Sequence, residues 1–195
     1  MKKKITAFIM MLLVAIFIST SCGVASAVTY LSLGTGGVTG VYYPLGGAMA
    51  NLITQKIPGY NCTAESTGGA VENAMLIYKN KIDIGFVDAS SAFNAPRKKG
   101  AFANEDVKNL RGLVSVYPES VQVVTLDKNI KTIGDLKGKR VAVGSPGSGT
   151  EVMAKDLLTL YGLTYDDIKE DFLGFGDASS GLKDKTLDAA FIWAG

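Results

Sequence analysis

The sequence predicts an α/β fold made of two units, each built around a mainly parallel sheet, and three observations support this prediction. Short β-rich runs alternate with segments of helical periodicity along the chain after residue 27. Glycine-rich turns stand where predicted strands lead into predicted helices. Of the 195 residues, 47% are hydrophobic and 19% are charged, which is enough apolar material for a packed core and excludes wholesale disorder.

The first unit is expected over residues 28–117 and has a strand–helix–strand–helix–strand order. Such an order favours parallel strands joined by helical crossovers. Pro44 suits the first turn of a helix, where an N–H group has no intrahelical acceptor. Cys62 is expected as a small core residue on a strand. The predicted strands cover 30–33, 60–66, 82–87 and 110–116, the predicted helices cover 44–56 and 71–80, and 95–109 is expected to be a surface segment.

The second unit is expected over residues 118–195, after a crossover near Ser115–Gln122. Strands are predicted at 121–126 and 140–144, near Phe172 and at 187–193, and helices at 132–136, 148–161, 165–169 and 178–183. Because the sequence stops within the apolar run Phe191–Trp193, we expect a C-terminally truncated chain. That apolar run should then be unpaired and exposed.

The N-terminal segment has the pattern of a secretory signal peptide over residues 1–27. Lys2 to Lys4 precede the uncharged apolar run Ile5–Ile18, and Ala25-Ser26-Ala27 is typical of a cleavage site. The apolar run is too short for the roughly 20 residues of a membrane span. Cys22 raises the further possibility of a lipid-modified cysteine.

Composition excludes several classes of function. The chain has no histidine, which removes Ser-His-Asp hydrolysis and histidine-ligated zinc, and two cysteines are too few for a four-cysteine metal site. The 20 basic residues nearly balance the 18 acidic ones, and three of the basic residues lie in the predicted signal peptide. The sequence has no basic stripe with interleaved aromatics, and we expect no nucleic-acid partner.

Three glycine-rich turns are the candidate binding elements: Gly34–Gly40, Ser66–Gly69 and Gly144–Thr150. Such turns bring backbone N–H groups and a helix N-terminus together, an arrangement that suits an anion. In open α/β sheets, ligands bind beyond the carboxyl ends of the strands, where all three turns are predicted to lie. Two structural alternatives remain open: Ser148 and Glu151 fit a capping box, and Asp88 fits an N-cap.

Nucleotide-binding motifs do not match these turns. A dinucleotide fingerprint would need a third glycine where Thr39 stands. A P-loop would need a lysine and a hydroxyl residue where Thr150 and Glu151 stand. Ser180 and Lys183 fit the short S-x-x-K pattern of some acyl-enzymes, but the companion motifs are missing.

Several separated motifs together resemble one family. These are Leu33-Gly34-Thr35-Gly36-Gly37 through Tyr42-Tyr43-Pro44-Leu45-Gly46-Gly47, then Ser66-Thr67-Gly68-Gly69-Ala70-Val71-Glu72-Asn73, then Ile82-Asp83-Ile84-Gly85-Phe86, then Val143-Gly144-Ser145-Pro146-Gly147-Ser148-Gly149-Thr150. In this order they resemble the TAXI family, the extracytoplasmic solute receptors of tripartite ATP-independent periplasmic (TRAP) transporters.

The resemblance implies a two-lobed, type II periplasmic binding protein that closes about a hinge on a small carboxylate or amino acid such as glutamate. It implies delivery of that solute to an ion-driven TRAP permease in the membrane, a periplasmic or lipid-anchored location, no enzymatic activity, and no cofactor or metal. Tyr42 is expected to form a packing wall and Asp88 to contact an amino group. The ligand-binding residues expected in the cleft are Gly36, Gly37, Thr39, Tyr42, Thr67, Gly69, Asn73, Asp88, Ser90, Ser145, Ser148, Gly149 and Thr150.

Two hypotheses from other classes remain beside the receptor. A secreted serine acyl-enzyme would use Ser180 as nucleophile and Lys183 as base. A lipid-anchored surface protein would have no role in transport at all.

Overall fold

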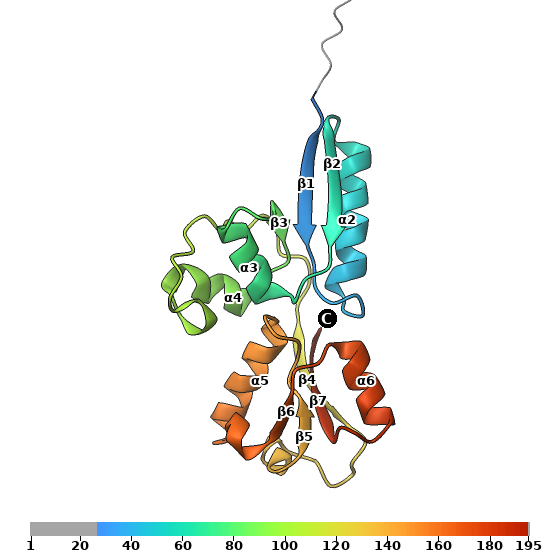
Figure 1. Cartoon of the computed structure of the whole chain (residues 1–195), viewed down its shortest axis with the longest axis vertical. Helices are drawn as coiled ribbons and strands as arrows, with labels where there is room; N and C mark the ends of the chain where they lie inside the picture. Colours follow the sequence, from blue (N-terminus) through green and yellow to red (C-terminus); the bar gives the residue numbers. More distant parts are fainter. Residues whose placement is uncertain (1–26, 195) are drawn as a thin grey trace, which may run out of the picture.

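The computed structural model describes residues 27–194, which form two α/β lobes lying end to end (Figure 1). Lobe 1 contains a three-stranded sheet and lobe 2 a four-stranded sheet. The predicted signal peptide, including Cys22, lies outside the described residues except for Ala27. No helix among the described residues is both long and apolar enough to cross a bilayer.

The sheet of lobe 1 is parallel, with the order β2-β1-β3. Helix α2 packs on it through a core of Leu33, Ala50, Cys62 and Phe86, so the predicted core position of Cys62 is confirmed. The elements of this lobe are β1 (Thr29–Gly34), α2 (Tyr42–Lys56), β2 (Tyr60–Glu65), α3 (Ala70–Tyr78), β3 (Ile84–Gly85), α4 (Ala89–Asn94) and the 3-10 helices η1 (Ala95–Arg97) and η2 (Gly100–Phe102).

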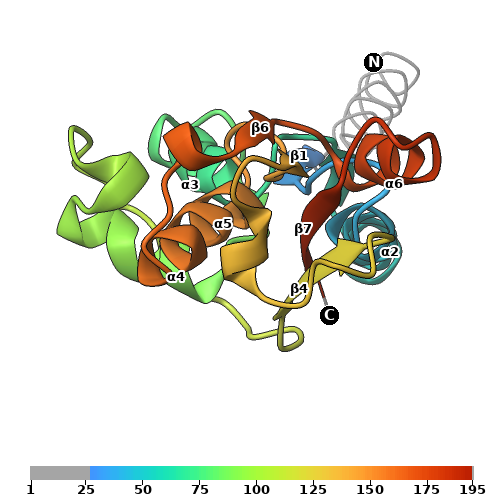
Figure 2. The same ribbon diagram turned by 90° about the horizontal axis from the view of Figure 1, so that it is seen from below.

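The sheet of lobe 2 has the order β4-β7-β5-β6, in which only β4 runs antiparallel to its neighbour. Helices α5 and α6 cover opposite faces of this sheet (Figures 1 and 2). Alternation along β5 explains this, since Val141 packs in the core with α5 and Ala142 in the core with α6. The elements are β4 (Ser120–Thr125), η3 (Ile133–Leu136), β5 (Arg140–Ala142), α5 (Gly149–Leu160), η4 (Tyr165–Asp167), β6 (Lys169–Asp171), α6 (Phe175–Lys183) and β7 (Ala189–Ala194).

The expectation of an unpaired apolar run at Phe191–Trp193 is wrong. Strand β7 lies between β4 and β5 and pairs with both, and Phe191 is only 1% exposed. The physical reason is the antiparallel β4, which supplies the hydrogen-bonding neighbour that the sequence pattern alone did not assign to this run.

The strand predicted at 110–116 is also absent. These residues are irregular, and the side chains of Leu113 and Val114 are 79% and 71% exposed. No described strand runs beside them, and an extended apolar run without a partner gains neither ladder hydrogen bonds nor burial. Strand β3 is likewise shorter than the predicted 82–87, and β6 ends one residue before Phe172.

Candidate functional site

A cleft with about 570 Å³ of empty space, open solvent at its mouth included, lies between the two lobes. Both lobes and the crossover between them contribute to its lining: Gly36, Gly37, Thr39, Gly40, Val41, Tyr42, Gly68, Gly69, Ala70, Asp88, Tyr117, Glu119, Ser145, Gly149, Thr150, Gly174, Phe175, Trp193 and Ala194.

Helices α2, α3, α5 and α6 all begin at this cleft. Each of them follows the carboxyl end of a strand: β1, β2, β5 and β6 respectively. Helix N-termini leave N–H groups without intrahelical acceptors and carry partial positive charge. Among the described residues, the N–H groups of Ala70, Gly149 and Thr150 have no acceptor outside the helices. The cleft therefore offers backbone donors from both lobes to an anionic group.

Glycine at the junction lets the two lobes approach each other closely. A Cβ atom on Gly149 would lie 2.5 Å from Oδ2 of Asp88 and 3.1 Å from the Trp193 ring. A Cβ atom on Gly68 would lie 2.5 Å from the carbonyl oxygen of Pro146 in the other lobe. Side chains at these two positions would separate the lobes.

Two hydrogen bonds join the lobes beside the cleft. The N–H of Glu72, in the first turn of α3, donates to the carbonyl oxygen of Gly147 at 3.1 Å. The N–H of Gly176, in the first turn of α6, donates to Oγ1 of Thr39 at 3.0 Å. The cleft is thus bounded by contacts between helix starts of one lobe and turns of the other.

Asp88 is the buried acid of the cleft, with an exposed fraction of 4%. It is the N-cap of α4: Oδ1 accepts the N–H of Ser91 at 2.8 Å, and Oδ2 accepts the Ser91 hydroxyl at 2.7 Å. The structural alternative considered for Asp88 is therefore confirmed, and the same carboxylate also faces the start of α5 at Gly149.

Glu119 is a second acid of the cleft and was missed from sequence. Its carboxylate accepts a hydrogen bond from Tyr117 Oη at 3.1 Å, and the Tyr42 hydroxyl lies near it. Burial raises the pKa of Glu119 above its ordinary value, the two tyrosine hydroxyls oppose this, and the charge of Asp88 adds to it. The signal available in the sequence was an acidic residue next to Pro118 within the predicted crossover.

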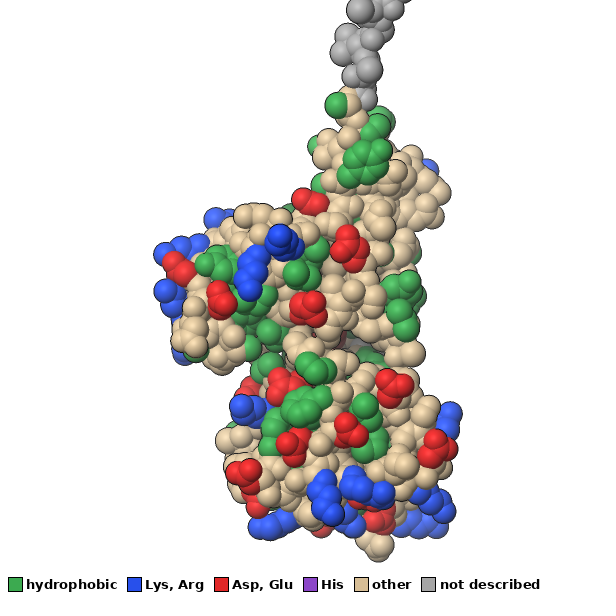
Figure 3. Space-filling view, viewed as in Figure 1, with side chains coloured by type: hydrophobic (Ala, Val, Ile, Leu, Met, Phe, Trp, Pro, Cys, Tyr) green, Lys and Arg blue, Asp and Glu red, His purple; other side chains and the backbone are tan. Residues whose placement is uncertain are grey.

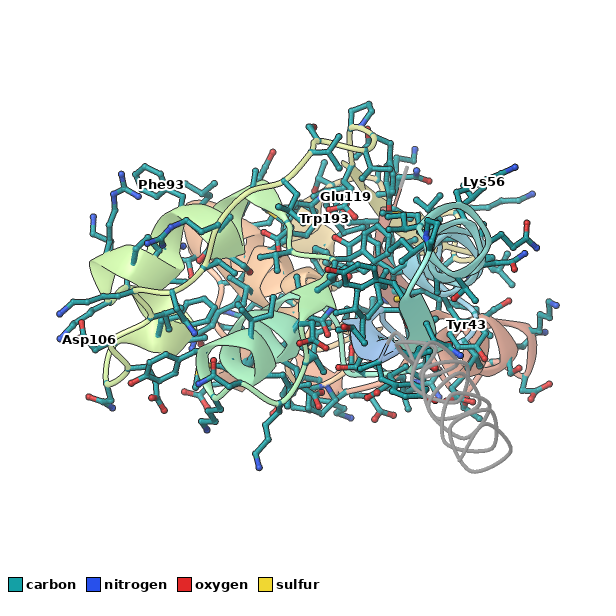
Figure 4. All side chains as sticks on the ribbon, turned by 90° about the horizontal axis from the view of Figure 1, so that it is seen from above. Tyr43, Lys56, Phe93, Asp106, Glu119 and Trp193 are labelled. Carbon is teal, nitrogen blue, oxygen red and sulfur yellow. The ribbon has the colours of Figure 1, made fainter. Side chains whose placement is uncertain are left out.

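Aromatic rings shape one wall of the cleft. Tyr42 stacks on Phe86 with ring centroids 4.9 Å apart, which agrees with its expected packing role. Burial, followed by the charge of Glu119, raises the pKa of both Tyr42 and Tyr117, so these hydroxyls stay protonated donors. Trp193 at the end of β7 also lines the cleft, and Figure 4 shows it beside Glu119 near the middle of the molecule.

Asp88 and Glu119 are the charged side chains of the cleft lining, and no lysine or arginine is among the described residues that line it. Lys and Arg side chains gather instead at the far end of lobe 2 and on the outer side of lobe 1 (Figure 3). The site is thus a negatively charged cleft whose positive potential comes from helix N-termini.

Comparison with known proteins gives the family of the chain. A model of the NMT1-like family matches residues 33–195, which is most of the sequence. The chain belongs to the NMT1-like family.

Solved structures show the fold of this NMT1-like chain. The alkanesulfonate-binding protein SsuA from Xanthomonas axonopodis pv. citri, bound to MOPS, is 23% identical with a TM-score of 0.59, and the match covers 87% of this chain and 56% of that one. A binding protein component of an ABC phosphonate transporter from Pseudomonas aeruginosa is 14% identical with a TM-score of 0.57, covering 85% and 57%. A structure from work on glutathione import through GshT and the cystine ABC importer TcyBC of Streptococcus mutans is 16% identical with a TM-score of 0.53, covering 85% and 68%.

These likenesses show that the NMT1-like chain has the type II periplasmic binding protein fold, as the resemblance implied. The chain spans little more than half the length of the first two structures.

Most of the site residues predicted from sequence lie around the cleft of the NMT1-like chain. These are Gly36, Gly37, Thr39, Tyr42, Gly69, Asp88, Ser145, Gly149 and Thr150. Thr150 is 6% exposed as a residue, and its hydroxyl, which has no hydrogen-bond partner among the described residues, is not itself a buried group. Sequence placed these residues at strand ends and helix starts, which is where the cleft formed.

The structure places Thr67, Asn73, Ser90 and Ser148 outside the cleft lining. The Asn73 amide donates to the carbonyl oxygens of Gly34, Thr35 and Phe86, so it joins the ends of β1 and β3. The Thr67 hydroxyl donates in turn to Asn73 Oδ1 at 2.8 Å, and Ser90 Oγ accepts a hydrogen bond from the Asn94 amide. These side chains order the turns of lobe 1.

Ser148 caps α5 by accepting the N–H of Glu151 at 3.1 Å. The expected capping box is only half present, because the Glu151 carboxylate does not accept the backbone N–H of Ser148. It accepts instead a hydrogen bond from Tyr165 Oη at 3.1 Å, which ties α5 to η4.

The Ser180/Lys183 pair lies on α6 away from the cleft. Ser180 is exposed, and its hydroxyl donates to the carbonyl oxygen of Gly176, one turn earlier in its own helix, at 3.2 Å. A nucleophilic serine would instead pass its proton to a base within a binding cavity, so this arrangement does not favour the acyl-enzyme hypothesis.

Proposed function

We propose that this chain acts as an extracytoplasmic solute receptor that holds a small organic anion or amino acid, glutamate-like or a dicarboxylate, between its lobes. The single observation that carries the proposal is the cleft at which unpartnered helix N-termini of both lobes meet. A solute bound there contacts both lobes at once, so binding favours lobe closure about the crossover.

Binding is tested by thermal shift and titration calorimetry of the mature chain against dicarboxylates, keto acids, amino acids, sulfonates and phosphonates. A ligand present at a hundredfold its Kd is expected to stabilise the protein by about 2.7 kcal/mol. If no member of the panel raises the melting temperature or gives binding heat, the proposal is wrong.

For the membrane partner, we propose an ion-driven TRAP permease that receives the solute in the periplasm. The sequence motifs that resemble the TAXI family support this choice, whereas the structural neighbours are named for ABC transporters. The two partners are distinguished by uptake into proteoliposomes that contain the candidate permease, with the receptor outside. Uptake that needs a sodium or proton gradient but no ATP is expected, and uptake that needs ATP would contradict the TRAP assignment.

The acyl-enzyme is tested directly on Ser180. Treatment with a fluorophosphonate probe followed by mass spectrometry is expected to leave Ser180 unlabelled. A stoichiometric adduct on Ser180 that Lys183→Met abolishes would contradict the receptor proposal and favour the secreted enzyme. Solute binding by the whole chain, in turn, would argue against a surface protein without any transport role.

A further inference from the structure

We propose that Glu119 is the specificity-determining residue of the cleft and binds a cationic group, so that the solute is a zwitterion with an ammonium group beside its anionic group. This inference rests on the proposed function and specifies the chemistry of the solute that the same cleft takes.

The charged side chains that line the cleft are both acidic. Asp88 and Glu119 both face the cleft, and no lysine or arginine lies among the described residues that line it. A solute with only negative groups would enter against two carboxylates in a partly desolvated space, where charges interact strongly. An ammonium group on the solute would neutralise one of them.

The two acids differ in the groups that stabilise their carboxylates. The carboxylate of Asp88 is already stabilised by the start of α4, through the N–H and hydroxyl of Ser91, and it faces the start of α5 at Gly149. The carboxylate of Glu119 has only the neutral hydroxyls of Tyr117 and Tyr42. Glu119 is therefore the cleft carboxylate that lacks a compensating positive charge.

Glu119 lies in the chain where the crossover enters lobe 2. It directly precedes β4, whose first residue, Ser120, pairs with Ala194 of β7. This register brings Glu119 to the cleft close to the end of β7, while Tyr42 reaches it from α2 of lobe 1. A cation bound at Glu119 thus lies where lobe 1, the crossover and lobe 2 meet.

The cleft also contains a separate group of donors for the anionic group of the solute. Thr150 lines the cleft and is 6% exposed as a residue, and its hydroxyl, without a hydrogen-bond partner among the described residues, is not itself a buried group. The backbone N–H groups of Gly149 and Thr150 beside it also have no acceptor there. The cleft therefore contains an unneutralised carboxylate on one element and unused donors on another, which matches a zwitterion.

The titratable groups around Glu119 come from three elements: Tyr42 of α2, Tyr117 of the crossover and Asp88 at the start of α4. Both tyrosines stay protonated because burial raises the pKa of each. Burial also raises the pKa of Glu119, so a proton competes with the ammonium group on mild acidification. Affinity for a zwitterion is therefore expected to fall on acidification, and to do so at a higher pH than the ordinary pKa of a glutamate would give.

The test uses pairs of probes that differ by one amino group: L-glutamate and glutarate, taurine and ethanesulfonate, 2-aminoethylphosphonate and ethylphosphonate. In calorimetry on the whole mature chain, the amino member of the best-bound pair is expected to have a Kd about tenfold lower than its partner, or lower still. Glu119→Gln is expected to remove most of that difference and the pH dependence. Glu170→Gln, an exposed acid of β6 outside the cleft lining, is the matched control and should change neither.

Each outcome decides a separate question. If the members without the amino group bind as tightly as their partners, the receptor stands and the role of Glu119 is refuted. The same holds if Glu119→Gln folds, as judged by circular dichroism, and retains the discrimination. If no probe of either kind binds and no solute of the wider panel binds either, the proposed function itself is contradicted, and this inference with it.

Discussion

Thr150 and Ser148 lie two positions apart in the same turn and have different roles. Ser148 Oγ accepts the N–H group of Glu151 and caps α5, whereas Thr150 lines the cleft and its hydroxyl has no hydrogen-bond partner among the described residues. A hydroxyl that already accepts an N–H group contributes mainly to helix stability. A hydroxyl aimed into an open site is free to contact a ligand.

We therefore expect Thr150→Val to lower ligand affinity about fivefold, equivalent to roughly 1 kcal/mol, by removing one hydrogen bond. The stability of the ligand-free protein should change little, because the substitution keeps the branched shape. Ser148→Ala is the matched variant and should lower the free energy of unfolding by about 1 kcal/mol with little effect on affinity. Denaturant melts and calorimetry on both variants check this, and a reversed pattern would place the ligand at Ser148.

Among secondary-structure elements, β5 and β7 are joined by an ion pair as well as by their ladder. Asp188, just before β7, accepts the backbone N–H of Arg140 at 2.8 Å and two side-chain hydrogen bonds from its guanidinium, at 2.7 and 3.1 Å. These donors lower the pKa of Asp188 to about 2, with the guanidinium of Arg140 as the largest cause.

This lowered pKa predicts an acid-dependent loss of stability. The unfolded carboxyl has a pKa near 3.9, so the stabilisation is complete above that value and is lost as the pH falls from about 4 through about 2. Asp188→Asn should reduce stability at neutral pH and flatten the slope of the unfolding free energy below pH 4. Urea melts across this pH range measure that slope, and an unchanged slope in the variant would refute the role of the pair.

At the level of the whole molecule, closure of the lobes depends on the absence of side chains at their junction. The nearest neighbour of a Cβ atom on Gly68 would be a backbone carbonyl of lobe 2, which a rotamer change cannot move aside. The hydrogen bonds from Glu72 to Gly147 and from Gly176 to Thr39 also need the present spacing. The relative position of the lobes is therefore sensitive to a single methyl group.

Gly68→Ala is expected to hold the lobes apart and to weaken ligand binding about tenfold or more, since overpacking costs about 1–3 kcal/mol. Small-angle scattering with saturating ligand should show a larger radius of gyration than for the unsubstituted protein. Gly47→Ala, on the exposed face of α2 with no atom within 4 Å of the new Cβ, is the control. It should leave affinity unchanged and stabilise the protein by up to about 1 kcal/mol. Equal affinities for both variants would show that Gly68 does not limit closure.

Local pattern alone predicted most elements of this protein and the placement of its glycine turns. Alternating apolar residues marked β1 and β2, helical periodicity marked α2, α3 and α5, and the order of these elements indicated parallel sheets. The turn residues Gly36, Gly69 and Gly149 were accessible to sequence reasoning because ligand sites of open α/β sheets lie at strand ends. These features depend on residues that are close together in the sequence, so a short window of the sequence is enough to predict them.

Tertiary structure alone decided which residues meet. Glu119 lies beside Tyr42, and the Asn73 amide donates hydrogen bonds to carbonyl oxygens at the ends of β1 and β3. Both contacts are between segments that are distant in sequence. Residues 110–116 and the segment of β7 are both predicted as strands from sequence, yet only β7 is a strand, because only β7 has strands on both sides. Pairing and burial depend on partners that a local pattern does not specify, so they decide which predicted strands form.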